Sequence, residues 1–406
     1  MKISTAIIIS LIFIAISDVL MYLSWDGFAS TWAAYIMIPL RFVSLFVLIY
    51  IALKKKWQHF IPKIIFRLFL VLITWNIFTI TRGFLFANDY YDWKFLFDTS
   101  ILFLLIPLAL VIGINHSYTQ KLFSVTIKFL FLFGFAIIPL TLVTNIQLYS
   151  RLMIPISIFI VLSPFLKPKW RVLILIVAAT SILIVPIFRT NIIRIVAGLL
   201  LVFAYHLRSF IKISWLKFFH FLLFILPFIL FYLAITNQFN IFKFQEKDNK
   251  YATIDNKGQT RNYLEDNRTF LYAEVLLSLQ KNGNLILGEG ATGKYKSDFY
   301  DFGDRRGRYM SEIGFLNTLL FSGIIGLIIQ SVFLFLVSYY ALYKSNNWLS
   351  KMLGLFIASR WLIFFVEEYT LFDLNFFFYW VLLGIVSTNE FRSMTDSEIK
   401  NFFQKI

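Results

Sequence analysis

Long apolar stretches, separated by short polar segments, follow one another along most of the chain. Because a helix rises about 1.5 Å per residue, a stretch of about 20 apolar residues crosses the hydrocarbon core of a bilayer. The pattern predicts an all-α fold, a polytopic transmembrane bundle of about twelve helices. The predicted spans are 3–24, 31–53, 61–81, 97–114, 122–145, 152–166, 172–188, 191–207, 218–236, 312–343, 352–369 and 371–387.

Some of these stretches depart from the length of a simple span. The stretches 152–166 and 172–188 are short for a full crossing, and the tight link Phe188–Asn191 is compatible with a re-entrant turn. The stretch 312–343 is too long for one perpendicular span. We expect it to tilt, or to begin as an interfacial turn before it enters the bilayer.

One long polar segment interrupts the pattern. Residues 237–311 carry 12 basic and 10 acidic side chains over 75 positions. The segment divides the chain into N-terminal membrane helices (1–236), the polar loop (237–311), C-terminal membrane helices (312–387) and a tail (388–406). Loops of this length in a compact protein are usually functional.

The polar loop contains its own structural signals. Apolar residues at helical spacing predict an amphipathic helix over Glu265–Asn284, capped by Asp266 or Asn267. A glycine-rich turn is expected at Leu285–Gly293, and the charged stretch Asp301–Tyr309 is expected to act as a flexible lid.

The composition excludes whole classes of protein. Hydrophobic residues make up 59% of the 406 positions and charged residues only 15%, and the mean hydropathy is +0.75. These values exclude a water-soluble globule, a disordered chain and a fibrous repeat. Cysteine is absent, so disulfides, thiolate metal sites and thiol nucleophiles are excluded as well.

The formal charge of +16 is explained by topology. If the N-terminus is cytoplasmic, most basic residues of the short loops lie on the inside, as the positive-inside rule requires. These residues are Lys54, Lys55, Lys56, Lys121, Lys167, Lys169, Arg171, Arg208, Lys212, Lys217, Lys344, Lys351, Arg392, Lys400 and Lys405. The charge therefore predicts two cytoplasmic termini and an extracytoplasmic loop, and it does not indicate a nucleic-acid partner.

Histidine is the usual general base, but this topology places all four histidines at the cytoplasmic side. A reaction at the outer face would therefore need a carboxylate as its base. Arginines gather at the outer boundary, against the positive-inside tendency, and a guanidinium fork suits the oxygens of a phosphate. Headgroup contacts and local ion pairs are the alternative. The arginines are Arg82, Arg151, Arg189, Arg194, Arg261, Arg268, Arg305, Arg306 and Arg308.

Charges inside predicted spans mark either function or pairing. Arg189 and Arg194 lie where one apolar stretch ends and the next begins, and a turn there would bring both onto one anion. Arg360 precedes Glu367 and Glu368 by about two helical turns. For these residues, and for an ion pair between Asp18 and Arg41, a site role and a structural role both stay open.

Three motifs carry a resemblance to a known family. They are Asp-Asn-Arg-Thr-Phe-Leu-Tyr-Ala-Glu at 266–274, Asn-Leu-Ile-Leu-Gly-Glu-Gly at 284–290, and 312–326, which begins at Glu312 and ends in Gly323-Ile-Ile-Gly326. Their order and spacing resemble the O-antigen polymerase and O-antigen ligase superfamily. The family's His-Asn pair falls on Glu312 and Ile313, and Arg189 falls where the family often has Ser-Arg.

The resemblance implies an enzyme, a polysaccharide polymerase in the bacterial cytoplasmic membrane. It would transfer a glycan from undecaprenyl pyrophosphate to another lipid-linked repeat unit, without a metal or other cofactor. Glu312 and Arg189 are the implied catalytic residues, and a carboxylate at Glu312 can accept the proton of a sugar hydroxyl as a histidine can. The candidate substrate-binding residues are Arg194, Arg268, Arg305, Arg306, Arg308, Arg360, Glu367 and Glu368.

The expected partners are the undecaprenyl-pyrophosphate-linked glycan, membrane lipids, and flippase and chain-length regulator proteins. Two alternatives stay open. One is a ligase that transfers finished glycan to lipid A or protein, although the change from His to Glu favours the polymerase. The other is a flippase or other transporter, for which an internal repeat or interrupted helices would be the sign, and the sequence shows no evident repeat.

Overall fold

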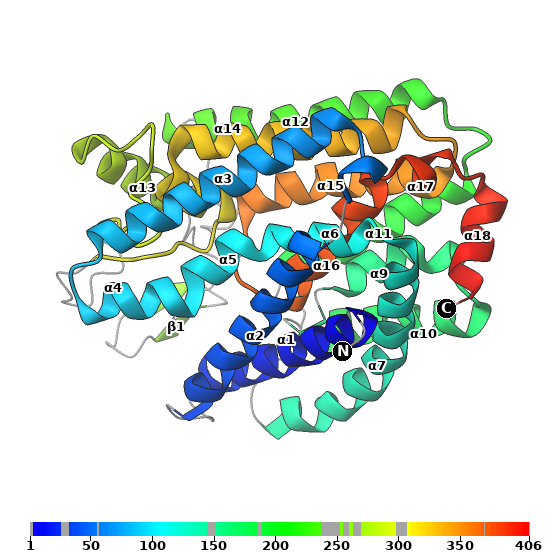
Figure 1. The fold of residues 1–406 in the computed structure, drawn as a ribbon, viewed down its shortest axis with the longest axis horizontal. Coiled ribbons are helices and arrows are strands. Elements are labelled where there is room, and N and C mark those ends of the chain that lie inside the picture. The colour runs from blue at the N-terminus through cyan, green and yellow to red at the C-terminus, as the bar shows by residue number, and fades with distance from the viewer. Residues whose placement is uncertain are drawn as a thin grey trace.

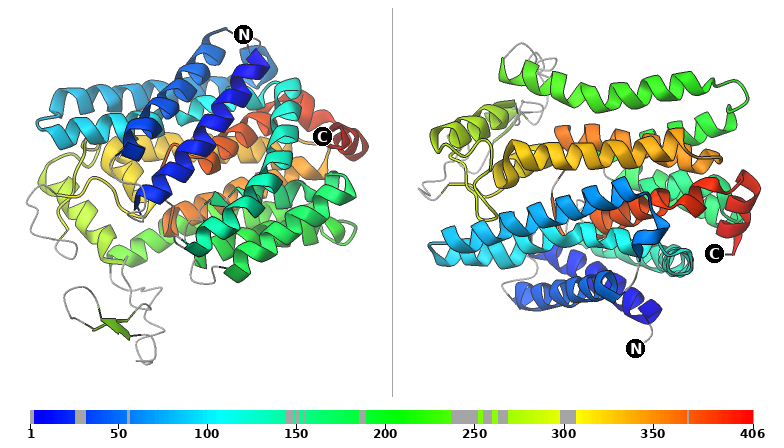
Figure 2. Two further views of the ribbon diagram at one scale, coloured as in Figure 1. Left: turned by 90° about the horizontal axis from the view of Figure 1, so that it is seen from below. Right: turned by 45° about the horizontal axis from the view of Figure 1, so that its top comes forward.

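Long helices run side by side in the computed structural model (Figure 1). The structure describes residues 3–25, 32–54, 57–143, 149, 152–153, 155–184, 189–236, 252–254, 260–262, 269–297, 307–368 and 370–405. The helix α13 lies at one end of the bundle, and α17 and α18 lie at the other (Figures 1 and 2).

The described parts of the first half of the chain consist of helices joined by short connections. Its elements are α1 (Ile3–Trp25), α2 (Trp32–Lys54), η1 (Trp57–Phe60), α3 (Lys63–Phe86), α4 (Tyr90–Phe95), η2 (Leu96–Ser100), α5 (Ile101–Leu105), η3 (Ile106–Ala109), α6 (Leu110–Gly113), α7 (His116–Val143), α9 (Ile156–Leu162), η4 (Ser163–Phe165), α10 (Pro168–Ile184), α11 (Arg189–His206) and α12 (Ile213–Ile235). The run from α4 to α6 changes pitch at η2, a π turn, and at η3, where Pro107 supplies no backbone N–H for an α-helical bond.

The second half contains the described parts of the polar loop and the last long helices. Its elements are β1 (Ala252–Ile254), β2 (Thr260–Asn262), α13 (Thr269–Lys281), α14 (Gly314–Tyr343), α15 (Trp348–Val366), α16 (Leu374–Ser387), α17 (Asn389–Ser393) and α18 (Asp396–Gln404). The strands β1 and β2 pair antiparallel, with Thr253 opposite Arg261.

The prediction of an all-α membrane protein is confirmed. Within the described residues, seven helices are long and apolar enough to cross a membrane. They are Ile3–Ser24, Trp32–Lys54, Lys63–Phe86, Tyr90–Gly113, Ile213–Ala234, Gly314–Tyr343 and Trp348–Val366. Shorter apolar helices occupy Ile156–Phe165, Thr190–His206 and Leu374–Ser387. The count of about twelve spans stays a prediction.

The stretch 312–343, expected to tilt or to begin as an interfacial turn, forms α14, and this helix is broken at Gly323. Its backbone there has φ 64° and ψ −170°, far from helical values. The excess length is thus resolved into two helical segments that meet at a break. Gly323, the first glycine of the motif Gly323-Ile-Ile-Gly326, makes the break possible, because only glycine adopts such a backbone conformation without strain.

The loop segment Asn284–Gly290 fills the break in α14. The amides of Glu289 and Gly290 donate to the carbonyls of Leu320 and Phe321 at 2.7 and 3.0 Å. In return, the amides of Ile324 and Ile325 donate to the carbonyls of Leu285 and Ile286 at 3.1 and 3.3 Å. Backbone groups freed inside an apolar bundle need such partners.

The amphipathic helix predicted over 265–284 corresponds to α13. Leu271, Val275 and Leu279 on its apolar face are buried, and the Tyr272 hydroxyl donates to the Phe365 carbonyl at 2.5 Å. The polar loop is therefore anchored on the end of α15. The proposed caps at 266 and 267, and residues 301–306 of the predicted lid, lie outside the described residues.

Candidate functional site

A cluster of buried charges lies where α15 ends and α11, α14 and α16 begin. Arg360, inside α15, forms an ion pair with Glu368, which follows the end of the helix. Both residues are only 3% exposed. The chain leaves the helix at Glu367 in extended conformation, with φ −165° and ψ 110°, and so turns the next carboxylate back toward Arg360.

Arg194 of α11 reaches the same two glutamates. Its Nη2 lies 3.7 Å from the Oε1 atom of Glu368 and donates to the backbone carbonyl of Glu367 at 3.1 Å. Thr190, one turn earlier on the same helix, donates from its hydroxyl to the Glu367 carboxylate. The cluster therefore joins α11 to the end of α15 through two residues on one side of the helix.

Asn375 at the start of α16 completes the network. Its Nδ2 donates to Glu368 at 3.0 Å, and its Oδ1 accepts from the Nη1 atom of Arg360 at 2.9 Å. Removing charges from water is costly, and close partners of opposite sign offset much of that cost. In spite of these partners, the Nε atoms of Arg194 and Arg360 are buried without a hydrogen-bond partner among the described residues.

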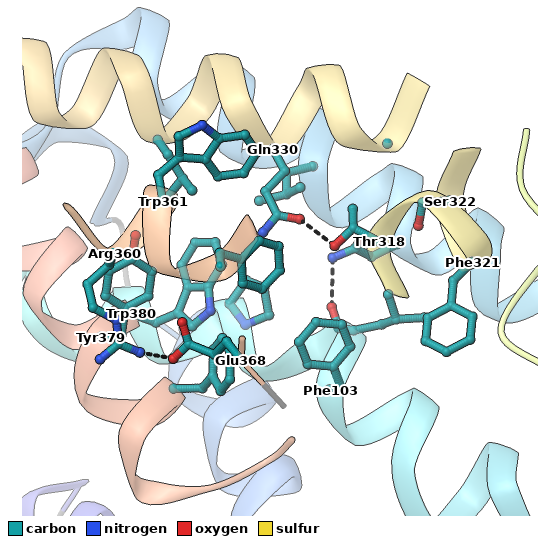
Figure 3. Close-up of a pocket in the computed structure, with 18 residues that line it drawn as sticks. Phe103, Thr318, Phe321, Ser322, Gln330, Arg360, Trp361, Glu368, Tyr379 and Trp380 are labelled. Carbon is teal, nitrogen blue, oxygen red and sulfur yellow. Dashed lines mark hydrogen bonds and ion pairs between the residues drawn. The ribbon is translucent and has the colours of Figure 1, made fainter. Parts of the chain in front are cut away.

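A small cavity adjoins this cluster, with Arg360 and Glu368 in its wall (Figure 3). Its volume of about 40 Å³ is room for about three water molecules, well below the size of a ligand pocket. Aromatic rings form much of the lining, and Thr318 donates to Gln330 across the break in α14 at 3.3 Å. The cavity therefore has room for water beside the cluster but not for a sugar ring in this conformation.

Glu312 lies next to the cluster through its backbone. Its carbonyl accepts from the amide of Glu368 at 3.0 Å, and its side chain is half-buried. The following turn is fixed by Asn317, which accepts from the Ser311 amide at 2.8 Å and donates to Thr370 at 3.0 Å. The residue expected to act as the base thus stands on a rigid turn beside the buried Glu368 and the half-buried Glu367.

The predicted residues divide into three groups. Arg194, Arg360, Glu367 and Glu368 come together, with the Glu312 backbone beside them. Arg308 lies elsewhere in the loop, where its backbone pairs with that of Tyr295. Arg268, Arg305 and Arg306 lie outside the described residues.

The expected turn between Arg189 and Arg194 is wrong. Arg189 is the first residue of α11, so both arginines belong to one helix. Five helical residues separate two side chains by about 140° around the axis. No local turn therefore brings Arg189 and Arg194 onto one anion. The Arg189 side chain lies outside the described part of the structure.

A second ion pair lies close to the start of α16. Asp18 and Arg41 approach to 3.5 Å, and Asp18 also accepts from the Leu374 amide at 2.9 Å. Asp373 caps the same helix by accepting from the Phe376 amide at 2.8 Å. The ion pair left open from the sequence is thus present and joins α1 to α2, while the bond from the Leu374 amide ties α1 to α16.

Sequence reasoning missed Thr190 and Asn375. Each is an uncharged polar residue at the start of an apolar helix: Thr190 follows Arg189, and Asn375 lies two residues after Asp373, the N-cap of α16. That position is the signal that could have found them, because polar groups at the start of an apolar helix need partners.

No protein-family model, no characterised protein sequence and no solved structure matches this chain. What the fold defines is a helical membrane protein with a buried charged cluster.

Proposed function

We propose that the chain is a membrane glycosyltransferase that polymerises lipid-linked oligosaccharide repeat units into a surface polysaccharide such as O-antigen, capsule or exopolysaccharide. The observation that carries this proposal is the pair of buried guanidinium groups, Arg194 and Arg360, that share Glu368 and each keep one Nε without a partner in the described structure. Three helices begin around them, and helix N-termini favour negative charge. This environment suits the oxygens of a leaving pyrophosphate.

The chemistry needs few groups because the sugar donor is already activated. A hydroxyl of the acceptor sugar forms a bond to the anomeric carbon of the donor, and the bond from that carbon to the pyrophosphate oxygen breaks. Glu312 takes the hydroxyl proton, and the guanidinium groups stabilise the departing pyrophosphate. The rigid turn at 311–317 would hold the carboxylate in place for this transfer.

The donor in this proposal is a glycan on undecaprenyl pyrophosphate, and the site faces the outer leaflet of the bacterial cytoplasmic membrane. Support comes from the basic residues of the short loops, which favour cytoplasmic termini. The cluster also lies at the same end of the bundle as α13, which docks on Phe365 just before Glu367. A flippase would supply the donor, and a chain-length regulator would bind the same complex.

The break in α14 favours a transporter as the second candidate, because interrupted helices are common in transporters. In transporters, however, the unwound backbone typically binds the substrate or ion. Here the loop segment Asn284–Gly290 occupies those backbone groups, so we rank transport second.

Reconstitution separates these functions. The purified full-length chain, in lipid nanodiscs, receives undecaprenyl-pyrophosphate-linked repeat units that carry a fluorescent label. A ladder of longer glycans, together with released undecaprenyl pyrophosphate, supports the polymerase. Transfer only to added lipid A or protein supports the ligase, and movement of the label across vesicle membranes without new glycosidic bonds supports a transporter; either result contradicts the polymerase.

A further inference from the structure

A second, open pocket lies on the α13 end of the bundle, apart from the arginine cluster. Its volume is about 340 Å³, within the range of small-ligand pockets. It lies between the end of α3, the start of α4 and the loop segment after α13. Among the residues that line it are Arg82, Phe86, Asp92, Asn284, Glu289 and Lys294.

The polar groups of this pocket are held in place by the protein. Asn282 and Asn284 each donate a side-chain N–H to Glu289, at 3.0 and 2.9 Å. Arg82 donates to the carbonyls of Leu287 and Gly288 at 2.7 and 2.8 Å. Fixed orientations favour binding, because these side chains lose less conformational entropy when a ligand binds.

The opposite wall is equally ordered. Lys294 lies 2.6 Å from the Asp92 carboxylate, which also accepts from the Tyr309 hydroxyl at 2.8 Å. Asp92 is buried, although it lies at the end of the bundle where the polar loop packs. The pocket therefore has two cationic and two anionic groups, each fixed by a neighbour.

This balance of charge selects the class of ligand. The basic groups of this pocket already bind protein oxygens and two carboxylates stand beside them, which disfavours a phosphate; the basic groups disfavour a cation, and a polar lining disfavours an acyl chain. Side-chain amides, which donate and accept, and carboxylates, which accept, suit the hydroxyls of a sugar. Phe86, 56% exposed at the edge, offers an apolar face to the C–H side of a sugar ring.

Backbone hydrogen bonds connect the pocket to the cavity beside the candidate active site. Glu289 turns its side chain to the pocket, while its amide bonds the Leu320 carbonyl of α14. The neighbouring Gly290 bonds the carbonyl of Phe321, whose side chain lines the cavity beside Arg360. A ligand in the pocket is thus one short loop away from the arginine cluster.

We infer that this pocket binds a neutral oligosaccharide, the glycan of the acceptor repeat unit. The inference that the pocket binds a sugar depends on the pocket alone, and the inference that this sugar is the acceptor rests on the proposed function.

Saturation-transfer NMR on the full-length protein in nanodiscs tests the binding. The probes are neutral disaccharides of hexoses and N-acetylhexosamines at millimolar concentration, with inorganic pyrophosphate as competitor. We expect at least one disaccharide to bind, with pyrophosphate unable to displace it. Glu289→Gln and Asn282→Ala should each weaken binding about tenfold, since a hydrogen bond to a charged group is lost. Asn282 is exposed, so its substitution tests the pocket without risk to the fold.

Lys281→Ala is the matched control, because Lys281 is exposed on the last turn of α13 and does not line the pocket. The inference is overturned if no disaccharide binds, if pyrophosphate displaces the bound sugar, or if the Glu289 and Asn282 variants bind as the control does. If a disaccharide binds but the protein does not polymerise repeat units, only the proposed function is contradicted. If both pocket variants polymerise repeat units with an unchanged KM for the acceptor, only the acceptor role of the pocket is contradicted.

Discussion

Gly288 and Gly323 lie backbone to backbone, where the polar loop enters the break in α14. A Cβ atom on Gly323 would lie 2.4 Å from the amide nitrogen of Gly288, and a Cβ on Gly288 would lie 2.5 Å from the amide nitrogen of Gly323. Both residues have positive φ, 75° and 64°. Gly288 and Gly323 are 35 residues apart in the chain, and their two motifs thus form one structural joint.

The first prediction is that Gly288→Ala strongly destabilises the protein. The new methyl group would overlap backbone atoms of Phe321 and Gly323, which a rotamer change cannot relieve. Overpacking and left-handed backbone strain together should cost about 2–4 kcal/mol. The measurement is thermal unfolding in detergent, followed by tryptophan fluorescence.

Gly283→Ala is the matched control for this joint. Gly283 has a similar φ of 69°, but a Cβ there would meet nothing within 4 Å. We expect a cost of about 1 kcal/mol, from the backbone alone. Equal melting temperatures for the two alanine variants would contradict the tight approach.

Hydrophobic pattern was enough to predict the membrane bundle, because span length follows from bilayer thickness alone. It also singled out Arg194, Arg360, Glu367 and Glu368, since charges inside apolar stretches are rare and need partners. Their convergence was not predictable, because it depends on how α11, α15 and α16 pack.

The break at Gly323 was missed for a related reason. The residues around it are as apolar as those of a continuous span, so periodicity and hydropathy do not change there. The backbone groups are satisfied by a segment about 35 residues earlier in the chain, and no local pattern reports a contact of that kind.

The second prediction concerns the buried pair of Arg360 and Glu368. Arg360→Met or Glu368→Leu alone leaves one buried charge without its main partner, and should cost about 3–5 kcal/mol. The double variant should recover part of that stability, because both charges of the pair are gone while Arg194 keeps its hydrogen bond to the Glu367 carbonyl but loses Glu368. Thermal unfolding of the three variants gives the coupling.

The same double variant separates function from structure. If the guanidinium binds the donor pyrophosphate, the double variant should be stable but inactive in the polymerisation assay. A double variant that is both stable and fully active would reduce the pair to a structural role.

The third prediction is that Arg194→Lys impairs donor use although the positive charge is kept. Lysine cannot contact Glu368, the Glu367 carbonyl and a phosphate oxygen at once, because it lacks the planar fork. Loss of one charge-assisted contact of about 1.5–3 kcal/mol should lower kcat/KM for the lipid-linked donor by about 10-fold to 150-fold.

Arg208→Lys is the control for Arg194→Lys, since Arg208 is exposed beyond the other end of α11 and stacks on Tyr205. It should polymerise at the wild-type rate. Wild-type kinetics for Arg194→Lys itself would remove that residue from the donor site. Arg189→Lys, measured in the same series, reports whether the first residue of α11 also contacts phosphate.

The fourth prediction places the polar loop outside the cytoplasm. A reporter that is active only outside the cytoplasm, inserted near Gln259, should be active, because the basic short loops favour cytoplasmic ends. The same reporter after Lys405 should be silent. The reversed pattern would contradict the orientation, and with it the encounter of the loop with an outer-leaflet donor.

The last prediction is that Glu312→Gln nearly abolishes chain growth while the protein stays folded. The Glu312 carbonyl, and not its carboxylate, holds the Glu368 amide, so the substitution keeps that bond and the shape of the turn. General-base catalysis typically contributes about 10²–10⁴-fold, and the amide cannot accept the hydroxyl proton. Glu312→His should retain some activity, because imidazole can act as a base. The rate of glycan extension in nanodiscs, with thermal unfolding as the check on folding, measures both variants. Extension at the wild-type rate by Glu312→Gln would transfer the role to Glu367, whose half-buried carboxylate lies in the adjoining turn.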